Sequence, residues 1–160
     1  MKLDVTQKTN KDVVARLWEI TTESFFGVER PPRGVFNHTL ESGDIYVNDD
    51  VDLCRHWLEQ SRCSWCPIYC YALVISKFGE PYIQSIATAP EHRGRGLAGR
   101  LIDEISREAI EAKAGGIGLT VNVNNTAAQR LYLDFGFRVE RVLRGYYGDD
   151  NGLFMRRKLC

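Results

Sequence analysis

A glycine- and arginine-rich segment, residues 93–98, has the residue types and spacing best suited to binding a ligand. Its sequence, Arg-Gly-Arg-Gly-Leu-Ala, follows a stretch typical of a β-strand and precedes one typical of a helix. Glycine lets the backbone approach a ligand closely, and the first amides of a helix lack an internal acceptor. Such a turn suits phosphate oxygens, which a helix dipole attracts by about 0.3 to 1 kcal/mol at exposed sites. Taken alone, the segment is better explained by solvated arginines at the start of a helix.

The spacing in this segment excludes two familiar phosphate loops. It lacks the Gly-Lys-Ser/Thr ending of a nucleotide triphosphatase and the Gly-x-Gly-x-x-Gly of a dinucleotide-binding fold. Any anion site must also depend on a local group of residues and not on the overall charge of the chain. Lys plus Arg equals Asp plus Glu at 21 each, so no global field favours nucleic acid or an anionic membrane.

Clustered cysteines offer a second candidate chemistry. Four of the five cysteines lie between positions 54 and 70, and a tetrahedral zinc site could draw on this set: Cys54 or His56, Cys63, Cys66 and Cys70. A zinc ribbon normally shows a second closely spaced pair, which this chain lacks. Cys66 and Cys70 also share the parity of the apolar positions in a predicted strand, as small buried residues would. We therefore expect free thiols and no metal.

The elements that position these residues follow from hydrophobic periodicity. Apolar residues at helical spacing predict helices over residues 11–25, capped by Asn10 or Asp12, over 97–114 and over 126–135. Apolar and β-branched runs predict strands over residues 3–5, 68–75, 82–88, 117–123, 137–143 and 153–159. The sequence also predicts a turn over residues 77–81 and a loop over residues 144–152. Pro31, Pro32 and Gly34 should end the first helix and begin a connecting segment, whereas residues 35–60 fit either a helix or a strand.

The composition is typical of one folded domain. Of 160 residues, 44% are hydrophobic and 26% charged, far from disordered, collagen-like or membrane chains. The first residues lack the apolar core of a secretory signal, and no run approaches the roughly 20 apolar residues of a membrane-spanning helix. We therefore expect a single cytoplasmic domain over residues 1–160, monomeric or homodimeric, with no nucleic-acid or membrane partner.

Two blocks of sequence resemble the GNAT superfamily of N-acetyltransferases. The pattern Arg93-x-x-Gly96-x-Ala98, preceded by residues 86–90, resembles the superfamily's acetyl-CoA motif. The later block, from Asn125 through Leu131-Tyr132 to Gly136-Phe137, is similar to its second cofactor and catalytic motif. Their order and separation fit that superfamily, and the resemblance covers residues from about 68 onward.

The resemblance implies a fold and a cofactor. The fold is α/β: a mixed, largely antiparallel sheet of six to seven strands, splayed between its fourth and fifth strands and flanked by about four helices. Backbone groups of Ile86 and Thr88 would pair with the pantetheine arm of acetyl-CoA, and amides of residues 94–99 would bind its pyrophosphate. The cofactor-binding residues implied are Ile86, Ala87, Thr88, Arg93, Gly94, Arg95, Gly96, Leu97, Ala98, Gly99 and Asn125.

The resemblance also implies catalytic roles. Tyr132 matches the family's tyrosine, whose phenol stays protonated at neutral pH and can protonate a departing thiolate. Related N-terminal acetyltransferases often carry a glutamate base on the fifth strand, where this chain has Thr120. Conceivable substitutes for that base are Glu29, Glu80, Glu59 and His38.

The acceptor class is indicated by the segment containing Tyr146 and Tyr147. It is similar to the paired-tyrosine loop of protein N-terminal acetyltransferases, including those that modify ribosomal-protein alanines, although Asn151-Gly152 replaces their usual Glu-Asp. The resemblance implies that this pair and Glu29 bind a protein or peptide N-terminus. A hairpin with ordinary aromatic packing explains the pair almost as well. Small-amine acceptors such as polyamines, amino acids and aminoglycosides stay open, as does a non-catalytic domain that senses acyl-CoA.

Overall fold

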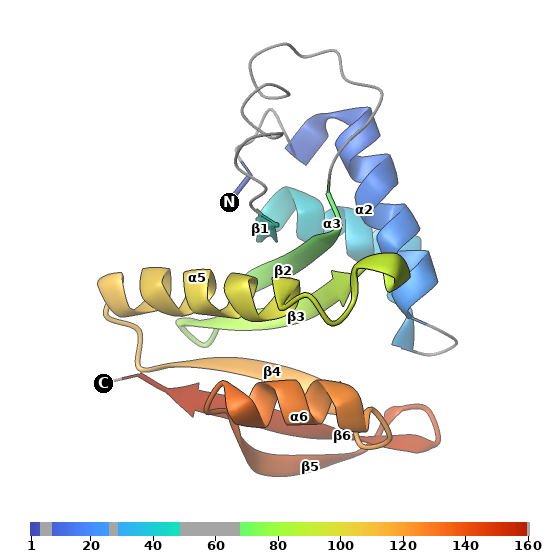
Figure 1. Ribbon diagram of the computed structural model, residues 1–160. Helices are drawn as coiled ribbons and strands as arrows, with labels where there is room; N and C mark the ends of the chain where they lie inside the picture. The colour runs from blue at the N-terminus through green and yellow to red at the C-terminus, as the bar shows by residue number, and fades with distance from the viewer. Residues whose placement is uncertain (4–7, 26–28, 49–67, 160) are drawn as a thin grey trace.

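Figure 1 shows a computed structural model of the chain, which describes residues 1–3, 8–25, 29–48 and 68–159. The helices in these ranges are α2 (Lys11–Ser24), α3 (Arg33–Ser42), the short 3₁₀ helix η2 (Pro90–His92), α5 (Leu97–Glu111) and α6 (Thr126–Asp134). The strands are β1 (Asp44–Val47), β2 (Cys70–Lys77), β3 (Glu80–Thr88), β4 (Gly116–Asn122), β5 (Arg138–Tyr147) and β6 (Asp150–Lys158). The expected α/β class is confirmed.

The six strands form one open sheet in the order β1-β2-β3-β4-β6-β5. All neighbouring pairs are antiparallel except β3 and β4, which run parallel. These two pair only at Tyr82 with Gly118 and Ile83 with Leu119. Beyond that point the halves of the sheet diverge (Figure 1). The expected splay is therefore present. If the isolated bridge between Lys2 and Tyr46 is counted as a first strand, β3 and β4 are the fourth and fifth strands.

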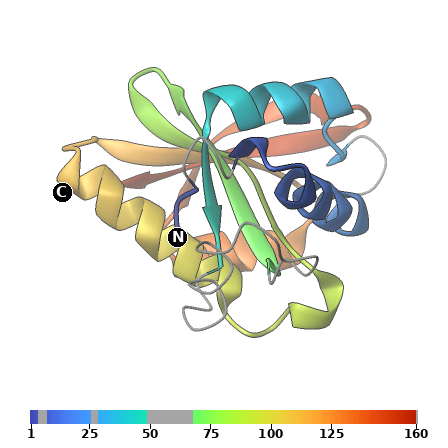
Figure 2. The same ribbon diagram turned by 90° about the horizontal axis from the view of Figure 1, so that it is seen from above.

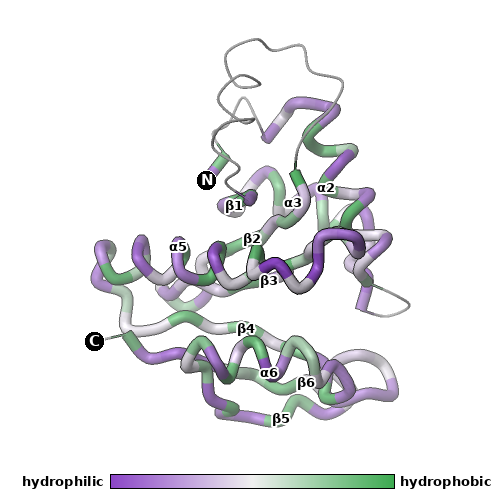
Figure 3. Tube along the Cα trace, viewed as in Figure 1, coloured by the Kyte–Doolittle hydropathy of each residue, from purple (hydrophilic) through white to green (hydrophobic). Residues whose placement is uncertain are grey.

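Helices cover opposite faces of the sheet. On one face α2 and α3 pack over the N-terminal strands, around the buried residues Leu17, Phe36, Tyr71 and Leu73. On the other face α5 and α6 enclose a second core that includes Ile102. Figure 2 shows α5 and the α2–α3 pair on either side of the strands, and Figure 3 shows hydrophobic and hydrophilic residues alternating along α5. The two cores hold β3 between them, which fixes the strand at the splay.

Helix α2 confirms the predicted amphipathic helix and its cap. The Asn10 side-chain oxygen accepts hydrogen bonds from the amides of Asp12 (2.9 Å) and Val13 (3.3 Å). These bonds satisfy amides that the first turn leaves without a helical acceptor.

Two sequence predictions about local structure were wrong. Pro32 and Gly34 do not begin a connecting segment, because Pro32 is the N-cap of α3 and proline is tolerated at the start of a helix. Most of the expected first strand, residues 4 and 5, lies outside the described residues; beside it Lys2 bridges to Tyr46, and the Leu3 amide donates to the Ile45 carbonyl at 2.8 Å. The expected loop over residues 144–152 is mostly strand, since β5 runs to Tyr147 and β6 starts at Asp150. Gly148, with a φ of 72°, makes the tight turn between them.

The ambiguous segment 35–60 lies only partly within the described residues. Residues 33–42 are helical and residues 44–47 form β1, whereas residues 49–60 lie outside the described residues. No helix among the described residues is long and apolar enough to cross a membrane.

Candidate active site

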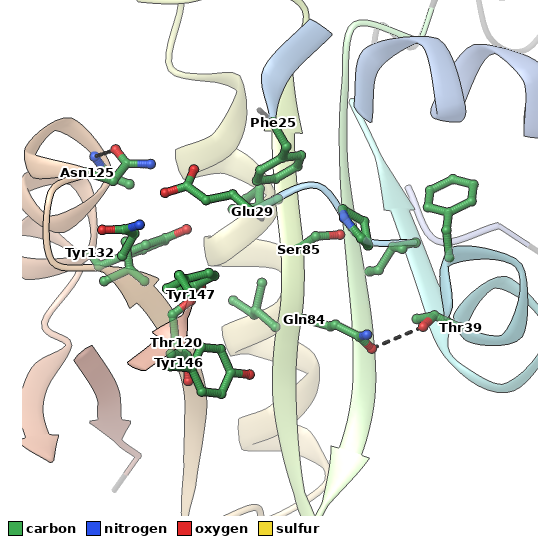
Figure 4. A pocket seen from close by; sticks show the side chains of 18 residues that line it. Phe25, Glu29, Thr39, Gln84, Ser85, Thr120, Asn125, Tyr132, Tyr146 and Tyr147 are labelled. Atoms are coloured by element: carbon green, nitrogen blue, oxygen red, sulfur yellow. Dashed lines mark hydrogen bonds between the residues drawn. The ribbon is translucent and has the colours of Figure 1, made fainter. Parts of the chain in front are cut away.

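A cleft opens where β3 and β4 separate, and it has a volume of about 200 Å³. Strands β2, β3 and β4, helices α3 and α6, and the end of β5 line it (Figure 4). The segment between α2 and α3 closes the remaining side. The lining residues include Phe25, Glu29, Pro31, Gln84, Ser85, Ile86, Thr120, Asn122, Asn125, Tyr132, Tyr146 and Tyr147. Most sequence-predicted catalytic and acceptor residues are thus brought together.

The glycine loop leads into α5 with its amides free. Gly94 and Gly96 have φ angles of 74° and 75°, and a side chain on either would extend into open space. The first helical bond joins the Arg100 amide to the Gly96 carbonyl. No acceptor among the described residues meets the amides of residues 94–99. A concave run of unpaired amides at the N-terminus of a 15-residue helix fits a diphosphate group.

Gly99 has a packing role in addition to its amide. A Cβ atom there would lie 2.7 Å from Cζ of Phe135, so only glycine allows this close approach of α5 and α6. The same contact holds the loop beside the helix that carries Asn125 and Tyr132.

Both loop arginines point at carbonyls of their own neighbourhood. Arg93 Nε donates to the Thr88 carbonyl (3.2 Å), and Arg95 Nη2 donates to the Glu91 carbonyl (3.3 Å). These contacts fix the conformation of the loop. The donors available to an anion are therefore the backbone amides, with the arginines adding positive charge from the side.

The edge of β3 that faces the cleft pairs with no strand beyond Ile83. The Ala89 amide donates to the Tyr69 carbonyl (2.8 Å), and backbone groups alternate in direction along a strand. Ala87 therefore faces β2, whereas Ile86 and Thr88 face the open side. A bulge at Gln84 shifts the register between β2 and β3 just before this stretch. The backbone groups of Ile86 and the Thr88 amide are placed to pair with an extended ligand, and Ala87 is not. The Thr88 carbonyl already accepts from Arg93 Nε and Ser24 Oγ, both at 3.2 Å.

Asn125 and Tyr132 enter the cleft from α6. Asn125 is the N-cap of the helix, and its side-chain oxygen accepts from the Ala128 amide at 3.1 Å. The Tyr132 ring packs on Phe137 and is 7% exposed, and Figure 4 shows its hydroxyl directed into the cleft. Burial, with a smaller contribution from Cys70, raises the pKa of Tyr132 above its usual value. The phenol therefore stays protonated through the neutral range.

Tyr146 and Tyr147 lie across the cleft from Glu29 (Figure 4). The two rings meet edge to face at 4.9 Å, and the Tyr147 hydroxyl donates to the Thr120 carbonyl at 3.1 Å. Burial raises the pKa of Tyr147 above its usual value, and the Glu29 charge contributes to that shift. The arrangement has a carboxylate on one wall and two aromatic hydroxyls on the other.

The residues considered as general base differ in whether they lie in the cleft. Thr120 lies in the cleft, where its hydroxyl accepts from the Tyr82 hydroxyl at 2.7 Å. Glu80 lies outside the cleft and is paired with Arg156, which lowers the pKa of its carboxyl. His38 is exposed on α3, outside the cleft, and Glu59 lies outside the described residues. Of the four carboxylate and imidazole candidates, Glu29 alone is seen to line the cleft.

Sequence reasoning missed Gln84 and Ser85 as cleft residues, together with Tyr82 behind Thr120. The sequence does contain an indication that these two residues are unusual. Gln84 and Ser85 are adjacent polar residues that interrupt an otherwise apolar strand, which is the pattern of a bulge or a functional edge.

Only Cys70 of the cysteine cluster lies within the described residues. It is buried in the α5 side of the core, as strand parity predicted, and the Thr88 hydroxyl donates to its sulfur at 3.1 Å. Burial raises its pKa to about 11. Cys54, His56, Cys63 and Cys66 lie outside the described residues.

The model of the acetyltransferase (GNAT) family matches residues 51–137, more than half of the chain. N-alpha-acetyltransferase 20 of Dictyostelium discoideum is 40% identical over 81 residues, which cover 49% of this chain and 46% of that protein. The NAA20 catalytic subunit of the N-terminal acetyltransferase B complex of Arabidopsis thaliana is 35% identical over 82 residues, with the same coverage. The match thus spans about half the length of these curated relatives.

A solved structure extends the likeness to the whole fold. The ribosomal-protein-S18-alanine N-acetyltransferase of Escherichia coli superposes with a TM-score of 0.74 at 17% identity, covering 99% of this chain and 94% of that one. At this identity the likeness concerns the fold alone, and it extends over nearly the whole chain.

Proposed function

The chain belongs to the acetyltransferase (GNAT) family, whose members use acetyl-CoA, and we propose that it acetylates the N-terminal α-amine of a protein or peptide. The observation that carries the proposal is the cleft beside the open edge of β3, with Glu29 on one wall and the Tyr146-Tyr147 pair on the other. The two NAA20 relatives, named for N-terminal acetylation, support the same class of acceptor.

The residues present fit the cofactor. The unpaired amides of residues 94–99 are donors for its pyrophosphate, and the backbone groups of Ile86 with the Thr88 amide are donors and acceptors for its pantetheine amides. Asn125 lies on the opposite wall of the splay. When bound, acetyl-CoA supplies an activated acetyl group and a thiolate leaving group.

The walls of the cleft suit a peptide terminus. The Glu29 carboxylate attracts an α-ammonium group and accepts its hydrogen bonds, and the tyrosine hydroxyls can bond to the first peptide groups. A chain end entering between these walls brings its amine to the splay of β3 and β4, where the backbone of Ile86 is free. The approach leads directly to the reacting position, as proximity catalysis requires.

Two side chains handle protons in this proposal. Glu29 takes a proton from the ammonium group, directly or through water, and so releases the neutral amine that attacks. Tyr132 holds a proton on its phenolic oxygen at neutral pH and directs it into the cleft, where a departing thiolate needs one. Thr120 cannot act as a base, and its hydroxyl instead holds Tyr82 beside the cleft.

Thiol release from acetyl-CoA, measured over a panel of peptides and small amines, tests the proposal. We expect turnover with peptide α-amines and none when the same peptides carry a blocked N-terminus. Turnover with polyamines, amino acids or aminoglycosides only would reassign the acceptor. Tight CoA binding without turnover on any amine would identify a sensor domain, which the threonine at position 120 would then explain.

A further inference from the structure

The wall of the cleft that carries Glu29 lies next to the end of α2. Phe25, the C-cap of α2, lines the cleft together with Glu29 and Pro31. Figure 4 shows the Phe25 ring beside the Glu29 side chain, whose carboxylate extends across the cleft toward the wall that carries Tyr132. The Glu29 carboxylate has no hydrogen-bond or ion-pair partner among the described residues. Its place in the cleft therefore depends on how the backbone at this residue is held.

Arg30 attaches that backbone to the end of α2. Its Nε donates to the Phe25 carbonyl and its Nη2 donates to the Thr22 carbonyl, both at 3.1 Å. The last carbonyls of a helix have no partner within it, and a cation beside them is also favoured by the helix dipole. The last turn of α2 contains no basic residue, so Arg30 provides this cap from outside the helix. Arg30 itself is exposed and does not line the cleft.

The end of α2 is in turn attached to β3 beside the splay. The Ser24 hydroxyl donates to the Thr88 carbonyl at 3.2 Å and accepts from Arg93 Nη2 at 3.4 Å. Arg93 also donates through Nε to the same Thr88 carbonyl. Thr88 is the last residue of β3, and its amide is one of the groups proposed to pair with the cofactor. The helix end therefore supports both the acceptor side and the cofactor side of the cleft.

We infer that Arg30 is a positioning residue: its bonds to the end of α2 set the place of the Glu29 carboxylate relative to the open edge of β3. The inference rests on the proposed function, because it assumes that Glu29 binds and deprotonates the acceptor's α-ammonium group. A guanidinium suits this role because its rigid fork of donors fixes two carbonyls at once, whereas an ammonium group is a single point charge. Such precision matters, since a displacement of about 1 Å can cost up to about 10²-fold in rate.

The charge of Arg30 and its positioning role predict opposite effects on the acceptor. Removal of a positive charge near Glu29 would by itself strengthen the attraction for an α-ammonium group. Loss of the two carbonyl bonds instead lets the backbone at Glu29 shift, which weakens binding and proton transfer. A lower kcat/KM for a peptide in Arg30→Met, which keeps an unbranched apolar side chain, therefore indicates lost positioning.

A double-mutant cycle with Glu29 tests the inference, with thiol release from acetyl-CoA as the measurement and one peptide as the acceptor. Arg30→Met should lower kcat/KM for the peptide about three- to tenfold and change the KM for acetyl-CoA less than about twofold. In the Glu29→Gln background the same substitution should change kcat/KM less than about twofold, because the carboxylate through which Arg30 acts is absent. Arg30→Lys, which keeps the charge and loses the fork, should lie between Arg30→Met and the wild type.

Arg33→Met is the matched control. Arg33 is also exposed and lies outside the cleft, and its guanidinium carbon lies over the Trp18 ring, 4.3 Å from the ring centre. This variant removes the same charge and a contact of similar kind, but it leaves the bonds at the end of α2 intact. It should keep the wild-type kcat/KM for the peptide.

The outcomes separate the positioning role of Arg30 from the proposed function. A loss of activity in Glu29→Gln with wild-type activity in Arg30→Met would overturn the inference and leave N-terminal acetylation standing. Equal losses from Arg30→Met in the wild-type and Glu29→Gln backgrounds would also overturn it, because they indicate a general structural role. Unchanged kcat/KM in Glu29→Gln, or no turnover with any peptide, would remove the proposed role of Glu29 and the inference with it.

Discussion

Tyr132 is the residue on which the proposed chemistry depends most. Tyr132→Phe keeps the ring that packs on Phe137 and removes only the hydroxyl that faces the cleft. Because a general acid contributes about 10²- to 10⁴-fold, kcat should fall by that amount, while the dissociation constant of CoA changes less than about threefold. Tyr46→Phe is the control, since Tyr46 bonds to Glu108 outside the cleft. Undiminished turnover in Tyr132→Phe would exclude Tyr132 as the acid.

The pH dependence of kcat provides an independent check on the same residue. Burial raises the pKa of Tyr132, so its acidic form persists above the usual phenol range near about 10. A required acid loses activity as pH rises through its pKa, and a raised pKa moves that loss upward. The kcat profile should therefore stay level from about pH 8 to pH 10. An alkaline decline centred below pH 9 that disappears in Tyr132→Phe would contradict the assignment.

Glu29 should govern the acceptor and leave the cofactor unaffected. Glu29→Gln removes the charge that attracts an α-ammonium group, and a charge-assisted bond is worth about 1.5 to 3 kcal/mol. We expect kcat/KM for a peptide to fall about 10- to 100-fold, with the KM for acetyl-CoA unchanged. Added salt should weaken the wild type more than the variant. Glu23→Gln, exposed on α2, is the matched control; a loss there of equal size would show that general surface charge is responsible.

At the residue scale, three residues that the family resemblance assigned to the site do line the cleft: Tyr132, Asn125 and Glu29. Ser85 and Gln84 were missed as cleft residues because their position depends on a bulge and on packing against α3, which is distant in sequence. The catalytic and binding roles themselves stay predictions until the variants are measured.

The loop before α5 can be tested as an element. Gly96 has a φ of 75°, so any side chain there adds backbone strain of about 1–2 kcal/mol, although space is available. Gly96→Ala carries the strain alone, and Gly96→Asp adds a carboxylate at the amides proposed to hold the pyrophosphate. CoA affinity, measured by calorimetry, should fall modestly in the first variant and more than about 100-fold in the second.

Gly79→Asp is the control that distinguishes loss of the pyrophosphate site from the effect of backbone strain at a positive-φ glycine elsewhere. Gly79 has a φ of 80° and open space around it, but it lies in the turn between β2 and β3. This variant should keep wild-type affinity for CoA. If Gly96→Asp and Gly79→Asp bind CoA equally well, the loop is not the pyrophosphate site.

Elements were predictable where one periodicity extends over many residues. The helices of residues 11–24, 97–111 and 126–134 lie within a few residues of their predicted bounds, because each buries one apolar face. The start of helix α3 was misplaced because Pro32 and Gly34 were interpreted as a connecting segment, whereas Pro32 is the N-cap of this helix. The hairpin of β5 and β6 was shortened in prediction because its glycines concealed strand residues that pair across it.

At the scale of the whole molecule, the cleft exists because the two halves of the sheet meet at only two residue pairs. Gly118 lies at this junction, and a Cβ atom there would come within 3.2 Å of Tyr82 and 3.3 Å of Phe154. Neither a helical nor a strand pattern marks this position. Only the folded sheet shows that a small residue lets β3 and β4 join before they diverge.

Gly118→Ala should therefore weaken the junction and the cleft together. Its methyl group must displace two rings at a cost of about 1 kcal/mol, or roughly 2–4 °C in Tm for a domain of this size. Tyr82 also bonds to Thr120 in the cleft wall, so CoA affinity should fall as well. Gly34→Ala, which meets nothing within 4 Å in the first turn of α3, should instead raise Tm slightly. If Gly118→Ala lowers Tm but leaves CoA affinity intact, the junction supports the fold without setting the width of the cleft.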